Sequence, residues 1–189
     1  MPDDRAFLVL NTLYLKKIAT AQVIADVTGL PSDEVRETIS GLLADGSLLD
    51  MNGQLLLQES GTQSVLDYYR DCYRELRDRR TVIEWYDGFE TINGQFIKLV
   101  TDWQKSEGDE RIQERIQRVV DRLANALGEL TGVIPRYSQY VRRFERSLAL
   151  VDQGRHDFLC NPMVDSVHNI WFEFHEDILA VIGRPRDTT

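Results

Sequence analysis

The sequence predicts a mainly α-helical protein in two parts: three helices and a β-hairpin over residues 1–60, then a four- to five-helix bundle over residues 61–189. Apolar residues recur at helical spacing along most of the chain. Asn52-Gly53 stands between two short apolar runs, and this dipeptide is the strongest local signal for a hairpin. Capping residues and glycines separate the helical segments, so the elements can be assigned in order.

Two helices are predicted before Pro31. The first covers residues 4–17, and its apolar residues share one face: Phe7, Leu10 and Tyr14. Thr20 is a good N-cap for a second helix over residues 21–28, because its hydroxyl can accept a hydrogen bond from the first turn. Gly29 ends this helix, since glycine adopts a left-handed C-terminal cap without strain.

A third helix and the hairpin complete the first part. Ser32 is expected to cap the third helix, and acidic residues in its first turn suit the helix dipole. Gly46 ends this helix. Residues 48–57 then form two short strands around Asn52-Gly53.

The rest of the chain predicts a helical domain that follows a hinge at Ser60-Gly61. Its helical segments are expected at residues 62–80, 82–105, 111–130, 135–152 and 163–182. Gly88 or Gly94 could interrupt the second segment, because glycine weakens a helix interior.

Residues 6–57 resemble the winged helix-turn-helix of bacterial regulators of the MarR and GntR families. The stretch ATAQVIADVTGLPSDEVRETISGLLADGSLLDMNGQLLL carries this resemblance. It implies a winged-helix head that contacts double-stranded DNA and a helical domain that dimerises and senses a small ligand. The helix after the head often carries dimerisation in such regulators, and arginines and tyrosines interleave over residues 62–80, so a homodimer through this segment is expected.

The charge of the head favours a different function. Residues 1–60 hold nine acidic residues against four basic ones, whereas DNA-binding domains normally present a positive face. If the head binds DNA, the residues suited to phosphates or base edges are Lys16, Lys17, Ser32, Arg36, Ser40, Asn52 and Gln54. The alternative is a protein-interaction or accessory module that uses the acidic head as a docking surface, and both hypotheses stay open.

A transition-metal site is one candidate in the helical domain. Asp165, His168 and His175 lie on the segment expected to form the last helix, and imidazole and carboxylate are transition-metal ligands. The effector domain of GntR-type regulators, which this domain resembles, uses Asp and His ligands, although it draws three histidines from several helices. The alternative, which we favour, is two histidines that are hydrogen-bonded within an aromatic core.

A small-molecule pocket is a second candidate, because aromatic residues gather in two segments of the helical domain. They are Trp85, Phe89, Phe96, Trp103, Trp171 and Phe172. The favoured alternative is a packed aromatic core, which needs no ligand to explain its spacing.

Several functions have no support in the sequence. The chain has no GxxxxGK[ST], GxGxxG or Gly-x-Ser-x-Gly motif, so we expect a protein that is not an enzyme and needs no organic cofactor. No apolar run is long enough to cross a bilayer, and Cys72 and Cys160 fit free thiols, so a cytoplasmic protein is expected. Residues 86–186 are also distantly similar to helical domains that accompany phosphoenolpyruvate-utilising phosphotransfer proteins.

Overall fold

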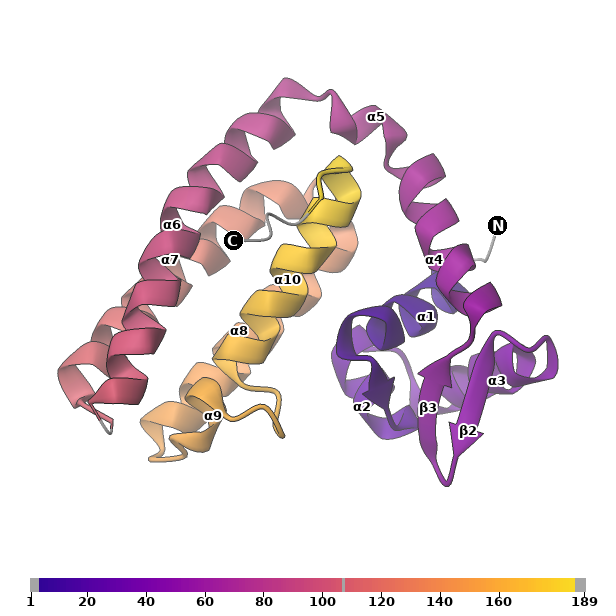
Figure 1. Cartoon of the computed structure of the whole chain (residues 1–189), viewed down its shortest axis with the longest axis horizontal. Coiled ribbons are helices and arrows are strands. Elements are labelled where there is room, and N and C mark those ends of the chain that lie inside the picture. The colour runs from indigo at the N-terminus through magenta and orange to yellow at the C-terminus, as the bar shows by residue number, and fades with distance from the viewer. Residues whose placement is uncertain (1–3, 107, 186–189) are drawn as a thin grey trace. The chain divides into compact units, whose positions relative to one another are not determined.

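The computed structural model describes residues 4–106 and 108–185. The chain is mainly helical and carries one three-stranded antiparallel sheet, which confirms the predicted fold class in outline (Figure 1). It divides into two compact units. One comprises the chain up to Asp78 together with the residues from His175 onward, here the N-terminal unit, and the other comprises residues 79–174, here the helical unit.

The first helices of the N-terminal unit match the predicted ones closely. They are α1 (Asp4–Lys16), α2 (Ala21–Thr28) and α3 (Ser32–Ala44). The Thr20 hydroxyl accepts a hydrogen bond from the Val23 amide at 3.3 Å, and Gly29 ends α2 with a φ of 75°, so both predicted caps are confirmed. The predicted Ser32 cap is wrong, because Ser32 is already helical and Pro31 stands at the cap position without a side-chain hydrogen bond.

The sheet consists of β1 (Ile18–Ala19), β2 (Leu48–Met51) and β3 (Gln54–Leu57), in the order β1-β3-β2. The β2–β3 hairpin is confirmed. Asn52 and Gly53 both have positive φ values, 57° and 86°, as the tight two-residue turn requires. Strand β1 was not predicted, because two residues are too few to show an alternating pattern.

The segment after the hairpin differs from its prediction. Gly61 is not a hinge, since it is buried in the first turn of α4 (Glu59–Cys72). The domain boundary predicted at residue 60 falls in the same helical turn. A single helix over 62–80 is wrong as well, because Tyr73 separates α4 from α5 (Arg74–Arg77) and Arg79 is extended.

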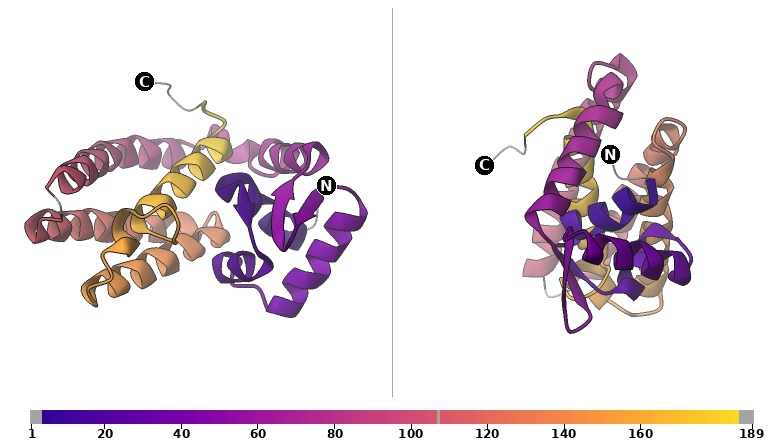
Figure 2. Two further views of the ribbon diagram at one scale, coloured as in Figure 1. Left: turned by 60° about the horizontal axis from the view of Figure 1, so that its bottom comes forward. Right: turned by 90° about the vertical axis from the view of Figure 1, so that its right-hand side faces the viewer.

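The helical unit contains two long helices, α6 and α7, which pack against each other and lie side by side in the left-hand panel of Figure 2. Its elements are α6 (Arg80–Lys105), α7 (Glu110–Thr131), the 3-10 helix η1 (Pro135–Tyr137), α8 (Ser138–Asp152), α9 (Asp157–Cys160) and the first half of α10 (Val167–Ile182). Helix α6 runs through Gly88 and Gly94 without a break, because its buried apolar residues hold it in place.

The last helix begins later than predicted. Asn161 to Ser166 form a loop, which Asn169 stabilises with amide hydrogen bonds to carbonyl oxygens of Asn161, Pro162 and Val164 at 2.8–3.3 Å. No helix in the described parts of the chain is both long enough and apolar enough to cross a membrane.

Candidate interaction surface of the N-terminal unit

The outward face of α3, which would contact DNA in a regulator, is more acidic than basic. Its exposed polar residues are Ser32, Asp33, Arg36, Glu37 and Ser40. Glu34, beside them, pairs with Arg5 of α1 at 3.3 Å between Nη1 and Oε2. This face therefore offers one exposed cation, Arg36, for a phosphate backbone that lysines and arginines normally neutralise.

The other predicted DNA-contacting residues lie on separate elements. Lys16 ends α1, and Lys17 follows it with a φ of 70°. The Lys17 ammonium donates a hydrogen bond to the Tyr14 carbonyl oxygen at 2.8 Å and lies over the Tyr14 ring, so it already has local partners. Asn52 and Gln54 are exposed at the hairpin tip, apart in sequence from Arg36 and Ser40 on α3.

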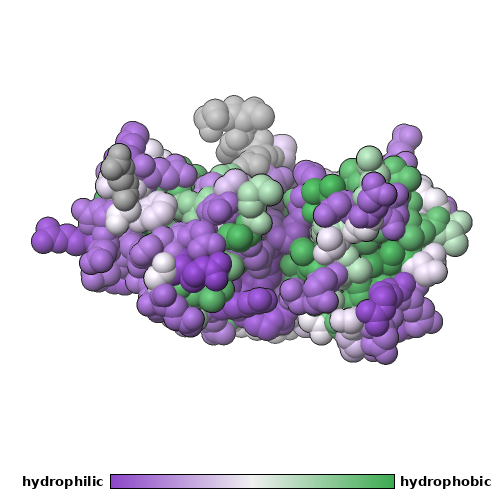
Figure 3. All heavy atoms as spheres, turned by 90° about the horizontal axis from the view of Figure 1, so that it is seen from below, coloured by the Kyte–Doolittle hydropathy of each residue, from purple (hydrophilic) through white to green (hydrophobic). Residues whose placement is uncertain are grey.

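The outer face of the sheet is apolar and exposed. Leu56 of β3 pairs with Ile18 of β1 on one side and with Leu49 of β2 on the other, so these three side chains form a row across the sheet. Met51 lies two residues beyond Leu49 and faces the same way. Ile18, Leu49 and Met51 are 48%, 46% and 56% exposed. We call these four residues the sheet face, and Figure 3 shows hydrophobic residues gathered over the N-terminal unit.

The opposite face of the same sheet packs inward. Ala19, Leu48 and Leu55 are each less than 5% exposed. The strands therefore carry apolar residues on both faces, although only one face is covered. Our sequence analysis missed the sheet face, and the signal for it was present: the runs around the hairpin are apolar at nearly every position instead of alternating.

The predicted metal ligands have other surroundings. Asp165 lies before α10, and its carboxylate accepts hydrogen bonds from the buried Arg143 at 2.6 and 2.9 Å. His168 packs against the rings of Phe96 and Phe172, and burial lowers the pKa of its imidazole.

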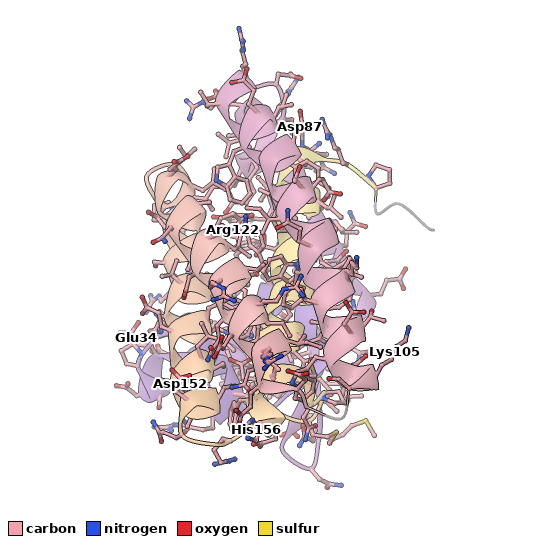
Figure 4. The ribbon with its side chains drawn as sticks, turned by 90° about the vertical axis from the view of Figure 1, so that its left-hand side faces the viewer. Glu34, Asp87, Lys105, Arg122, Asp152 and His156 are labelled. Carbon is pink, nitrogen blue, oxygen red and sulfur yellow. The ribbon has the colours of Figure 1, made fainter. Side chains whose placement is uncertain are left out.

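The histidines themselves are far apart. His175 lies two helical turns beyond His168, a rise of about 10 Å. The third histidine, His156, lies on the surface of the helical unit (Figure 4), where its Nδ1 is 3.0 Å from Gln113 Oε1. Among the described residues, no three His, Cys, Asp or Glu side chains form a group able to hold a metal. A metal site stays a prediction.

Four of the six predicted pocket residues, Trp85, Phe89, Phe96 and Trp171, form a cluster of contacting rings. Phe96 and Trp171 stack with their ring centroids 3.8 Å apart, and Phe89 lies 5.9 Å from both Trp85 and Trp171. The Trp171 indole N–H donates a hydrogen bond to Asn93 Oδ1 at 2.9 Å, which satisfies a polar group inside this cluster. Trp103, at the end of α6, and Phe172 are half-buried. The rings of Phe89, Phe96 and Trp171 are buried in the core of the helical unit.

Arg143 is the central charged group of this unit. It is 3% exposed and pairs with Glu173 at 2.6 Å as well as with Asp165. Although burial alone opposes its charge, the two carboxylates raise the pKa of the guanidinium, so the ion pairs hold it charged. This network joins α8 to α10 and to the loop before α10.

No protein-family model, curated protein or solved structure matches the chain.

Proposed function

We propose that the N-terminal unit is a winged-helix module that docks on another protein, and that the chain acts as a non-catalytic accessory or adaptor protein. The observation that carries this proposal is the sheet face, which presents exposed apolar side chains of Ile18, Leu49 and Met51 on one side of a rigid sheet. Apolar side chains that gather on a surface are typical of the centres of protein interfaces.

The negative charge of the first 60 residues indicates what kind of partner the N-terminal unit binds. The first 60 residues carry nine acidic and four basic residues, so two copies of this head would repel each other. A basic surface with apolar residues at its centre would be attracted to the acidic head and would cover the sheet face. The proposed partner is therefore a protein with a basic, amphipathic docking segment.

DNA binding is the second candidate function. The exposed Arg36 and Ser40 on α3, followed by a β-hairpin, favour it, because a recognition helix and wing would use such positions. The acidic neighbours of Arg36 count against it, since affinity for DNA comes largely from phosphate neutralisation.

One experiment separates the two functions. Fluorescence anisotropy would measure binding of the full chain to a peptide of alternating leucine and lysine and, separately, to mixed-sequence duplex DNA at about 50 and 200 mM salt. We expect the peptide to bind and the double variant Leu49→Ser/Met51→Ser to bind it about tenfold more weakly, because two apolar contacts are lost. Leu66→Ser is the matched control, since Leu66 is 42% exposed on α4 of the same unit.

The opposite pattern would refute docking by the sheet face. It consists of DNA binding that weakens steeply with salt and is lost in Arg36→Ala, together with peptide binding that Leu49→Ser/Met51→Ser leaves unchanged.

A further inference from the structure

Four arginines line one face of α7 in the helical unit. They are Arg111, Arg115, Arg118 and Arg122, at positions i, i+4, i+7 and i+11, and all four are exposed. Because successive residues of a helix are rotated by about 100°, this spacing keeps the four Cα atoms within an arc of about 60°. The rise of about 1.5 Å per residue makes the row about 16 Å long. We call these four residues the arginine row.

The arginine row has no counter-ions of its own. Arg111, Arg115 and Arg118 form no ion pair with any residue that the structure describes. Arg122, labelled in Figure 4 where α7 lies beside α6, donates a hydrogen bond to a neutral group, Gln95 Oε1. Like charges three and four residues apart destabilise a helix. A local arrangement that costs stability without a compensating contact is typical of a functional surface.

The surroundings of the arginine row make it a narrow strip. Glu114 and Asp121 are exposed along one border, about 70–90° round the helix from the centre of the row. Helix α6 forms the other border, on the side of Arg122. On the next turns of α6, the charges of Lys98 and of the half-buried Asp102 offset each other. A ligand that extends sideways beyond the row therefore meets carboxylates.

We propose that the arginine row binds an acidic helix of a partner protein, with glutamates or aspartates at the same i, i+4, i+7 and i+11 spacing. Such a helix presents four carboxylates within the same arc and over the same length, so each guanidinium donates a charge-assisted hydrogen bond to one of them. This second surface goes beyond docking by the sheet face and does not depend on it, because the two surfaces belong to different units.

A nucleic acid fits the arginine row less well than an acidic helix. A duplex carries phosphates on both sides of the strip and would bring some of them against Glu114 and Asp121. Single strands bind largely through stacking on aromatic side chains, and α7 contains no aromatic residue. The net charge of −9 also repels a long polyanion. A short helix with four carboxylates covers the row alone.

Two stapled, alanine-rich helical peptides of the same composition provide the test. The matched peptide carries glutamates at i, i+4, i+7 and i+11, and the control peptide carries the same four glutamates spread evenly round the helix. Fluorescence anisotropy would measure binding of each to the full chain at about 50 and 200 mM salt. We expect the matched peptide to bind about tenfold more tightly at the lower salt and to weaken at the higher salt, because exposed ion pairs are screened.

Matched variants locate the site. Arg115→Gln/Arg118→Gln removes two central cations and should bind the matched peptide about fivefold more weakly. Arg146→Gln/Arg155→Gln removes two exposed cations elsewhere in the helical unit and should bind it like the wild type.

A third variant should bind more tightly. Glu114→Gln/Asp121→Asn removes the two carboxylates beside the row, so the matched peptide should bind it about threefold more tightly than the wild type. A gain in affinity cannot come from unfolding, so this variant separates the loss of a binding surface from the loss of the fold.

Three results would overturn the proposal. One is equal affinity of the wild type for the two peptides, or of the wild type and Arg115→Gln/Arg118→Gln for the matched peptide. Another is tighter binding of a short single-stranded RNA than of the matched peptide, lost in Arg115→Gln/Arg118→Gln, which would make the row a phosphate site. The third is loss of the matched peptide in Leu49→Ser/Met51→Ser, which would place the peptide on the sheet face. Failure of the arginine row in the first two ways leaves docking by the sheet face untouched.

Discussion

Gly61 and Gly41 provide a matched pair of substitutions with opposite expected effects. A Cβ added at Gly61 would lie 2.4 Å from the Ser47 carbonyl oxygen and 3.0 Å from Leu57 Cδ2, whereas one added at Gly41 would meet nothing within 4 Å. Both glycines lie within helices, where alanine is preferred by about 1 kcal/mol. Gly41→Ala should therefore stabilise the protein by about 0.5–1 kcal/mol.

Gly61→Ala should destabilise it. Relief of the clash requires the backbone at Ser47 to move, and overpacking of this kind costs about 1–3 kcal/mol. The movement also strains the hydrogen bond from the Gln58 amide to the Ser47 carbonyl oxygen, 2.9 Å long, which contributes about 1 kcal/mol. After the helix-propensity gain is subtracted, we expect a net loss of about 1–3 kcal/mol.

Urea unfolding followed by circular dichroism would measure both variants against the wild type. The decisive quantity is the difference between the two variants, because they share the same chemical change. If Gly61→Ala were as stable as Gly41→Ala, the close approach of α4 to the turn between α3 and β2 would be refuted.

Three further predictions concern the helical unit and the thiols. Arg143→Met should destabilise the protein by about 3–5 kcal/mol, since it removes the cation that is paired with the buried Glu173 carboxylate, and adding Glu173→Gln should recover part of the loss. A cost below about 1 kcal/mol in urea unfolding would contradict the buried ion pair. Burial lowers the pKa of His168 in the folded state, so the unfolded state binds a proton more readily and the free energy of unfolding falls as the pH drops from about 7 to 5. The free energy of unfolding of His168→Gln should fall less steeply over this range. An identical pH profile for the variant and the wild type would argue against this burial. Burial raises the pKa of the Cys160 thiol to about 11, which makes its thiolate about 100-fold scarcer at pH 8 than that of an ordinary thiol. Cys72→Ser, which keeps only Cys160, should therefore react slowly with a disulfide reagent, and Cys160→Ser, which keeps the exposed Cys72, should react quickly. Equal rates would contradict the exposed position of Cys72.

Local signals in the sequence predicted local structure well. Thr20 caps α2, Gly29 ends it, and Asn52-Gly53 turns the hairpin, because each of these depends on the conformational preference of one or two residues and on hydrogen bonds to near neighbours. The apolar spacing of α6 and α7 likewise predicted their existence, since long amphipathic periods average over many residues.

Elements that depend on distant partners were predicted poorly. Strand β1 exists because Ile18 and Ala19 pair with Leu56 and Leu55 of β3, far along the chain. The break at Tyr73 carries no proline or glycine, and α6 continues through two glycines, because packing outweighs helix propensities of about 1 kcal/mol. The composition of one segment does not show which distant residues pair with it or pack against it.

The sequence by itself determined the acidity of the first 60 residues, the helical class of the chain and the hairpin, because charge, periodicity and turn preference are properties of residues and their near neighbours. Only the tertiary structure decided that Leu49 and Met51 face outward while Leu48 faces inward, and that Arg143 lies between Asp165 and Glu173. The Arg143 network joins residues far apart in the chain, and the packing of whole elements sets which of their faces are buried and which remain exposed.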